Sequence, residues 1–174
     1  FPYTTLFRSR DKKASVRDNY NEMVLSFKGY DVIFRAYDDG VAYRFVSRLK
    51  GDREVVSERA EFTFAGDWNL FVPYVDRSPE SFEAQFYNSF ENTYSYHKLS
   101  EWQDGQLAFL PLVVEAPEGI KVLVTEADLL DYPGMYLYNY GKGTSLSGVY
   151  AGYPDKVHQG GHNMLQISRS EERF

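Results

Sequence analysis

The sequence of 174 residues contains no cysteine. This absence excludes a disulfide framework, a zinc site built on cysteine and a thiolate nucleophile. Basic side chains are also in the minority, with 19 lysines and arginines against 25 aspartates and glutamates, so the formal net charge is −6. Because a nucleic-acid-binding domain needs a basic surface, this balance argues against that class. The sequence also lacks an apolar run near the roughly 20 residues of a membrane-spanning helix.

The amino-acid sequences at the two ends of the chain differ in character from the rest. Residues 1–9 are FPYTTLFRS and residues 169–174 are RSEERF. Both strings match translations of short-read sequencing adapters, each in the orientation expected at its end, and such segments are excluded from fold reasoning. The alternative is an ordinary strand and a charged tail. We expect residues 10–168 to be the protein proper, a partial domain that has lost both natural termini.

Aromatic and β-branched residues are abundant, and aromatics alone make up 17% of the chain. Residues 32–37 and 41–46 are two such runs, separated by Asp38-Asp39-Gly40. An Asp-Gly pair supplies the positive φ angles of a tight turn, so this pattern predicts a hairpin. A second hairpin is predicted where 107–115 and 120–126 flank Ala116-Pro117-Glu118-Gly119, because proline and glycine preset turn dihedrals.

Further short strands are expected at residues 24–27, 61–64, 69–75, 135–139 and 147–151. Many short strands separated by turn signals predict an all-β fold, an antiparallel β-sandwich. One segment is ambiguous, because Phe82, Phe86, Phe90 and Tyr94 recur at the spacing of a helix face. The surrounding Tyr, Asn and Ser favour irregular or strand structure, and we expect that instead.

Motifs for nucleophilic catalysis and phosphate binding are missing. The sequence has no Gly-x-Ser-x-Gly elbow and no glycine-rich phosphate loop. His158 and His162 are four apart, but Gly160-Gly161 between them would break the helix of a zinc motif, so we expect a structural loop. His97 stands among tyrosines and is expected to be a hydrogen-bonded loop histidine. The many aromatic residues fit either a core or a platform that stacks on sugars.

The acids with the most chemical interest are Glu126, Asp128 and Asp131. Glu126 follows Val122 and Val124 on one face of an expected strand. A carboxylate in that position is costly to bury unless it is paired or bound to a metal. Carboxylate oxygens suit calcium better than zinc. The alternative is a surface acid at the end of a strand.

Several segments, taken in order, resemble the N-terminal domain of glycoside hydrolase family 97. Two of them are VLVTEADL at residues 122–129 and DYPGMYL at 131–137. A third is VRDNYNE at 16–22, which leads into residues 32–45, and the segments at 111–116 and 153–166 fit the same pattern. The resemblance extends over nearly all of residues 10–168.

This resemblance implies a function for the whole protein. The family contains α-glucosidases and α-galactosidases, mostly periplasmic or secreted, in which an N-terminal β-super-sandwich packs on a catalytic (β/α)₈ barrel. The domain contributes one glutamate to a calcium site beside the oligosaccharide substrate, and that glutamate matches Glu126. The other calcium ligands and the catalytic carboxylates lie on the barrel, so we expect no catalytic residue here and an inactive fragment. The alternatives are a free-standing carbohydrate-binding β-sandwich and a structural sandwich without a ligand.

Overall fold

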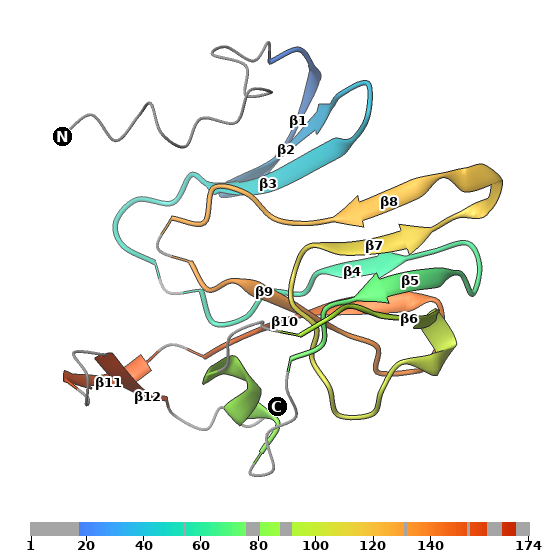
Figure 1. Cartoon of the computed structure of the whole chain (residues 1–174). Helices are drawn as coiled ribbons and strands as arrows, with labels where there is room; N and C mark the ends of the chain where they lie inside the picture. The colour runs from blue at the N-terminus through green and yellow to red at the C-terminus, as the bar shows by residue number, and fades with distance from the viewer. Residues whose placement is uncertain are drawn as a thin grey trace, which may run out of the picture. The chain divides into compact units, whose positions relative to one another are not determined.

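The computed structural model describes residues 18–53, 55–75, 81–87, 92–130, 132–152, 154–159 and 165–169. These residues contain twelve strands, all paired antiparallel, and three short 3₁₀ helices (Figure 1). The all-β antiparallel fold is therefore confirmed. The chain divides into two compact units, Phe1–Glu54 and Val55–Phe174, which we describe separately. The expectations for residues 1–9, Phe90, Asp131 and His162 lie outside the described residues.

The first unit is a three-stranded sheet in the order β1-β2-β3. Its strands are β1 (Asn21–Phe27), β2 (Tyr30–Ala36) and β3 (Val41–Ser47). Gly29, in the tight turn between β1 and β2, has a φ of 92°, a conformation that glycine adopts without steric cost.

The predicted hairpin of β2 and β3 is present, but its turn differs from the expectation. Gly40 does not have the positive φ that was expected of it. The Tyr37 N–H instead donates to the Gly40 carbonyl at 2.8 Å and closes a four-residue connection. A connection of this length does not need the left-handed residues that a two-residue hairpin loop requires.

The second unit contains two sheets that share a core. One has the order β4-β10-β9, the other the order β6-β5-β7-β8, and β11 pairs with β12 as a separate hairpin. The bounds are β4 (Glu61–Thr63), β5 (Asn69–Val72), β6 (Ser95–Lys98), β7 (Leu112–Glu115), β8 (Lys121–Val124), β9 (Met135–Tyr138), β10 (Ser145–Tyr150), β11 (Pro154–Gln159) and β12 (Leu165–Arg169). His158 thus lies in a strand, not in the loop that was expected.

The core between the two sheets is dry and tightly filled. Leu70 and Val114 of the four-stranded sheet and Leu137 and Leu146 of the three-stranded sheet are all completely buried in one hydrophobic cluster. Ala108 forms isolated β-bridges to Tyr74, which follows β5, and to Leu137 of β9. These bridges connect the chain after β5 to β9. This layered arrangement is the sandwich that the strand pattern predicts.

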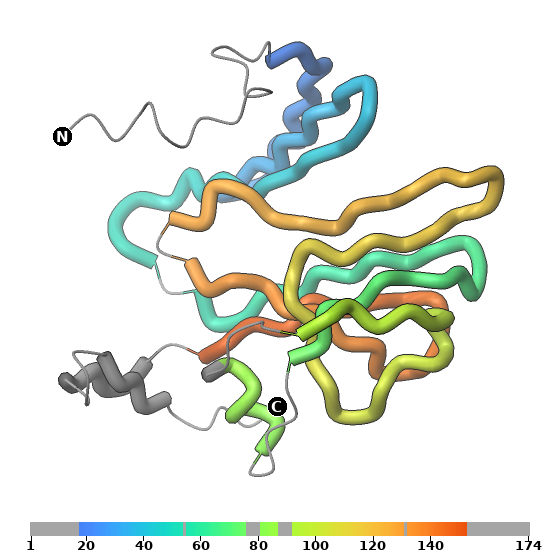
Figure 2. Tube along the Cα trace, in the orientation of Figure 1, coloured from blue at the N-terminus to red at the C-terminus, as the bar shows by residue number. Residues whose placement is uncertain are grey.

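The hairpin of β7 and β8 has the predicted turn. The 3₁₀ helix η3 (Pro117–Gly119) connects the strands, and Glu118 and Gly119 have φ values of 61° and 78°. The two arms run alongside each other in yellow and orange in Figure 2. Because β8 ends at Val124, two residues earlier than expected, Glu126 lies in the following loop and not on the strand.

The aromatic stripe belongs to neither an α-helix nor a strand within the described residues. Phe82 directly precedes the short 3₁₀ helix η1 (Glu83–Tyr87), and Phe86 lies within it. Phe82 and Phe86 pack against the small buried cluster of Val75, Leu107 and Val149. Tyrosine edges complete the contact, with the Phe86 ring 5.1 Å from that of Tyr136. Phe82 and Phe86 are therefore partly buried at the edge of the core, whereas Tyr94 is 43% exposed.

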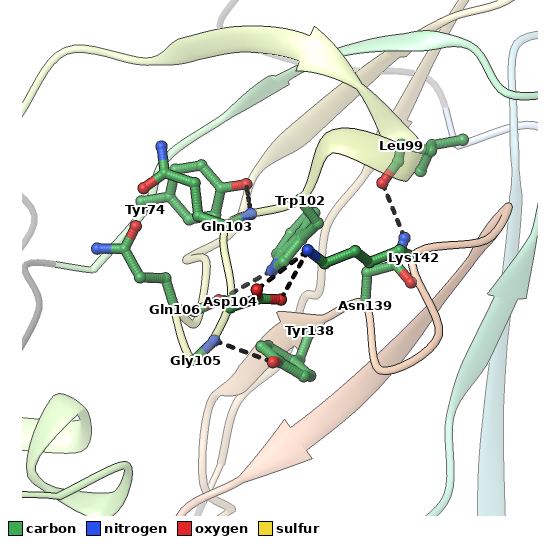
Figure 3. A network of polar contacts seen from close by, with 10 residues as sticks. All are labelled: Tyr74, Leu99, Trp102, Gln103, Asp104, Gly105, Gln106, Tyr138, Asn139 and Lys142. Carbon is green, nitrogen blue, oxygen red and sulfur yellow. Dashed lines mark hydrogen bonds and ion pairs between the residues drawn. The ribbon is translucent and has the colours of Figure 1, made fainter.

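The connection between β6 and β7 is held by polar contacts to the core. It begins with the 3₁₀ helix η2 (Leu99–Glu101). Figure 3 shows the indole N–H of Trp102 donating to the Gln106 carbonyl at 2.9 Å and the Gly105 N–H donating to the Tyr138 hydroxyl at 3.0 Å. The buried amide of Asn139 donates to the Leu99 carbonyl at 2.9 Å. Side chains from within the connection and from the end of β9 thus satisfy its backbone groups, as buried backbone requires.

His97 takes part in the same structural network. Its Nε2 lies 2.8 Å from the Tyr74 hydroxyl and its Nδ1 2.8 Å from the Lys98 carbonyl. The expectation of a hydrogen-bonded histidine is confirmed, although His97 lies on β6 and not in a loop.

No helix among the described residues is long and apolar enough to cross a membrane.

Candidate functional site

Glu126 lies half-buried in the loop that leads from β8 to β9. The Met135 N–H donates to both of its carboxylate oxygens, at 3.0 and 3.1 Å. A Cβ atom at Gly134 would lie 3.4 Å from Oε1, which is the limit of ordinary van der Waals contact. A small residue at position 134 therefore lets the loop backbone close over the carboxylate and fix its direction.

A second carboxylate, that of Glu58, lies close enough to act electrostatically on Glu126. The Tyr132 hydroxyl donates to Glu58 Oε2 at 2.5 Å, and the Tyr150 hydroxyl donates to Oε1 at 2.9 Å. Tyr132 comes from the same loop as Glu126, whereas Tyr150 ends β10. Glu58 therefore ties the Glu126 loop to the three-stranded sheet through two hydroxyl groups.

The electrostatics of this pair favour an added positive charge. Burial raises the pKa of the Glu126 carboxyl, the Met135 N–H opposes that rise, and the charge of Glu58 adds to it. Burial, together with the hydrogen bond to Glu58, raises the pKa of Tyr132 to about 12. The tyrosine hydroxyl therefore stays protonated at neutral pH and remains a donor to Glu58.

Neither carboxylate is neutralised by the described part of the chain. The ion pairs formed there join other acids, namely Glu22, Asp31, Glu61, Asp104 and Glu115, to lysine or arginine. Both carboxylates are partly buried oxygen donors, and carboxylate oxygens are groups that could serve as ligands to a hard divalent cation such as Ca²⁺.

The described residues cannot complete such a site alone. They contain no group of three His, Cys, Asp or Glu side chains that could hold a metal ion. Calcium takes six to eight oxygen ligands, so groups from elsewhere would have to supply the rest.

Asp128, the other described acid named from the sequence, forms no hydrogen bond with Glu126. Asp128 is exposed, has a φ of 54°, and accepts the Leu130 N–H through its backbone carbonyl. These features describe a turn residue. Asp131 lies outside the described residues.

The sequence analysis did not identify three residues around Glu126, namely Glu58, Tyr132 and Tyr150. Glu58 precedes β4 in a stretch without periodicity, so nothing local distinguishes it from a surface acid. Tyr132 lies in the DYPG segment and Tyr150 lies in the strand expected at 147–151, but their shared partner is separated from them by 74 and 92 residues. Only a prediction of contacts between residues far apart in the sequence could have placed the three side chains together.

Comparison with known proteins gives two results. Residues 3–165 match the family model described as glycosyl-hydrolase 97 N-terminal. The chain is also 46% identical over 158 residues to a retaining alpha-galactosidase of Bacteroides thetaiotaomicron, a match that covers 90% of this chain. The matched part makes up 24% of that relative, so the chain spans about a quarter of its length.

Proposed function

The chain belongs to the glycosyl-hydrolase 97 N-terminal family, and on this premise we propose that it is the non-catalytic N-terminal domain of a longer, calcium-dependent α-galactosidase. The observation that carries the proposal is the 46% identity to a quarter of a retaining alpha-galactosidase. Identity at this level favours α-galactosides over α-glucosides as the substrate class. The catalytic carboxylates of the retaining reaction, which must flank the scissile bond, belong in this proposal to the catalytic domain.

The contribution of this chain is to hold one calcium ligand in place. Glu126 would bind the ion, and the Met135 N–H keeps the carboxylate from rotating away. The Tyr132–Glu58–Tyr150 bridge fixes the loop that carries it. When bound, calcium would supply positive charge that orients the sugar through its oxygen atoms and stabilises negative charge on an oxygen at the reaction centre. Because the ion's other ligands come from the catalytic domain, docking of the two domains and calcium affinity are coupled.

The substitution Glu126→Gln in the full-length polypeptide tests this role. Glutamine keeps the shape of the side chain and can still accept the Met135 N–H, but it removes the negative charge from the ion. We expect calcium affinity to fall roughly tenfold or more, since ligand charge sets the affinity of such sites. Turnover at limiting calcium falls with it and recovers when calcium is raised. Isothermal titration of protein stripped with a chelator measures the affinity.

Glu118→Gln is the matched control, because Glu118 is exposed at the far end of the same hairpin. It should leave calcium affinity unchanged. If Glu126→Gln binds calcium as tightly as the unsubstituted enzyme, Glu126 is not a ligand and the proposed role of this domain fails.

A further inference from the structure

The outer face of the four-stranded sheet carries a row of polar side chains at one end. Asn69 on β5 pairs with Lys98 on β6 and with Glu115 on β7, and Glu115 pairs with Lys121 on β8. Paired residues of antiparallel strands project from the same face, so these four side chains form one continuous row. The opposite face at the next position is the buried core, where Leu70 is fully inaccessible.

A hollow of about 400 Å³ opens beside this row. Besides the four polar residues, its lining includes Asp67, Trp68 and the Pro117 turn. The hollow is shallow and open to solvent. Trp68 packs against the hydrophobic core cluster but remains partly exposed.

The aromatic wall of the hollow is fixed before any ligand arrives. The Asp67 carboxylate accepts the Ser100 N–H at 2.9 Å and the Ser100 hydroxyl at 2.7 Å. The Trp68 carbonyl accepts the Leu99 N–H at 3.0 Å. A Cβ atom on Gly66 would lie 2.5 Å from the Trp68 indole nitrogen, so the ring packs directly on a glycine backbone. Such rigidity lowers the entropic cost of binding.

The charges of the lining select the ligand. Asp67 and Glu115 are balanced by Lys98 and Lys121, so the hollow attracts neither a phosphate nor a cation. The Glu115 carboxylate accepts both the Lys121 ammonium and the Tyr96 hydroxyl, which orients it. A balanced set of donors and acceptors beside an aromatic ring suits a neutral ligand that is rich in hydroxyl groups and has an apolar face.

We propose that this hollow is a binding site for a neutral saccharide of one or two sugar rings. The Trp68 ring packs on the apolar C–H face of the sugar, and the Asn69 amide and Lys98 ammonium hydrogen-bond its hydroxyls. None of these residues contacts Glu126, so the site is distinct from the proposed calcium site. It would hold a saccharide on the surface of this domain.

The same face offers one competing use. Phe71, Tyr96 and Leu123 form the next row of the sheet, and their side chains are 37%, 52% and 57% exposed. An exposed apolar row of this kind also suits docking of another protein domain. The saccharide site is favoured because the charges that line the hollow are balanced and the hollow combines hydrogen-bonding groups with apolar surface.

The two tryptophans of the chain give a direct test. Trp102 is 2% exposed and serves as an internal reference for the fold. The ¹⁵N-labelled chain is titrated with melibiose and with maltose in EDTA, which removes any contribution of calcium. We expect the Trp68 indole N–H signal to shift saturably in the millimolar range while the Trp102 signal stays in place. Asn69→Ala should weaken the affinity at least threefold, and Asn21→Ala, in the other unit, should not.

A second measurement uses the full-length polypeptide, in which folding and domain docking are complete. Hydroxyl-radical footprinting should label Trp68 without sugar and show protection when either disaccharide is added. Protection of Trp68 in the absence of sugar would show that another domain covers this face and would overturn the proposal. Absence of a saturable Trp68 shift in folded chain, or equal shifts of both tryptophans, would also overturn it. Neither result bears on Glu126, so the calcium proposal stands or falls separately.

Discussion

At the scale of single residues, Asp67 links stability to pH. Its pKa lies below the ordinary value because the Ser100 N–H and the Ser100 hydroxyl both donate to the carboxylate. A carboxyl whose pKa is lower in the folded state stabilises the fold above its unfolded pKa, near 3.9. That contribution is lost as the pH falls through the folded pKa.

We therefore expect Asp67→Asn to lower the Tm at pH 7, and this difference should shrink as the pH falls through the lowered pKa of Asp67 and the native aspartate becomes protonated. Thermal unfolding followed by circular dichroism from pH 2.5 to 7 measures this. Ser100→Ala removes the hydroxyl donor and should show the same pH dependence with a smaller amplitude. A Tm difference that is constant over this range would contradict the role given to the ionised carboxylate.

The surroundings of Glu126, the residue to which we assign the proposed calcium role, could be predicted from the sequence only in part. Glu126 stands out because a carboxylate follows an apolar alternation, and the resemblance to a family gave it a role. Its partner Glu58 could not be found, because the tyrosines that hold it are far away in the chain. Local patterns identify a residue type in an unusual place; they do not identify what the fold brings to it.

At the scale of elements, the segment that leads into β5 depends on close packing of glycine and tryptophan. Gly66→Ala would place a methyl group 2.5 Å from the Trp68 indole nitrogen. The ring also packs near Phe64, with centroids 6.3 Å apart, so it has little room to yield. We expect a loss of about 1–3 kcal/mol in unfolding free energy, as for other overpacked sites.

Urea unfolding of this variant measures the loss. Gly141→Ala is the control, because a Cβ atom there meets nothing within 4 Å and the backbone is not left-handed. It should be close to neutral. Equal effects of the two substitutions would show that the tryptophan is free to move, and this would also weaken the case for a preformed saccharide site.

A secondary-structure element could be predicted from the sequence where the turn residues alone determine the backbone conformation. Glu118 and Gly119 adopt the left-handed angles that a Pro-Glu-Gly turn favours, so the β7–β8 hairpin was predictable. Gly40 does not adopt such angles, because the connection between β2 and β3 is longer than the tight turn that was expected. The Phe82 stripe was the hardest case, since burial against Val75 and Leu107 decides its conformation.

At the scale of the whole molecule, strand frequency and turn spacing were enough to predict an all-β antiparallel fold. The order of strands was not accessible in the same way. β10 lies between β4 and β9 although about eighty residues separate it from β4, and no local signal encodes such pairing. Contacts of this kind also delay folding, because loop closure precedes the gain from pairing.

The central claim is that this chain is one domain of a longer glycosidase, and reading the encoding DNA through both ends tests it most directly. A long single-molecule read should show the frame continuing past Ser168 for several hundred codons into a (β/α)₈ catalytic domain, because the chain matches only 24% of its relative. The same read should lack the sequences that encode residues 1–9 and 169–174. A stop codon close after Ser168 would contradict the account and would leave a free-standing saccharide-binding sandwich as the better explanation.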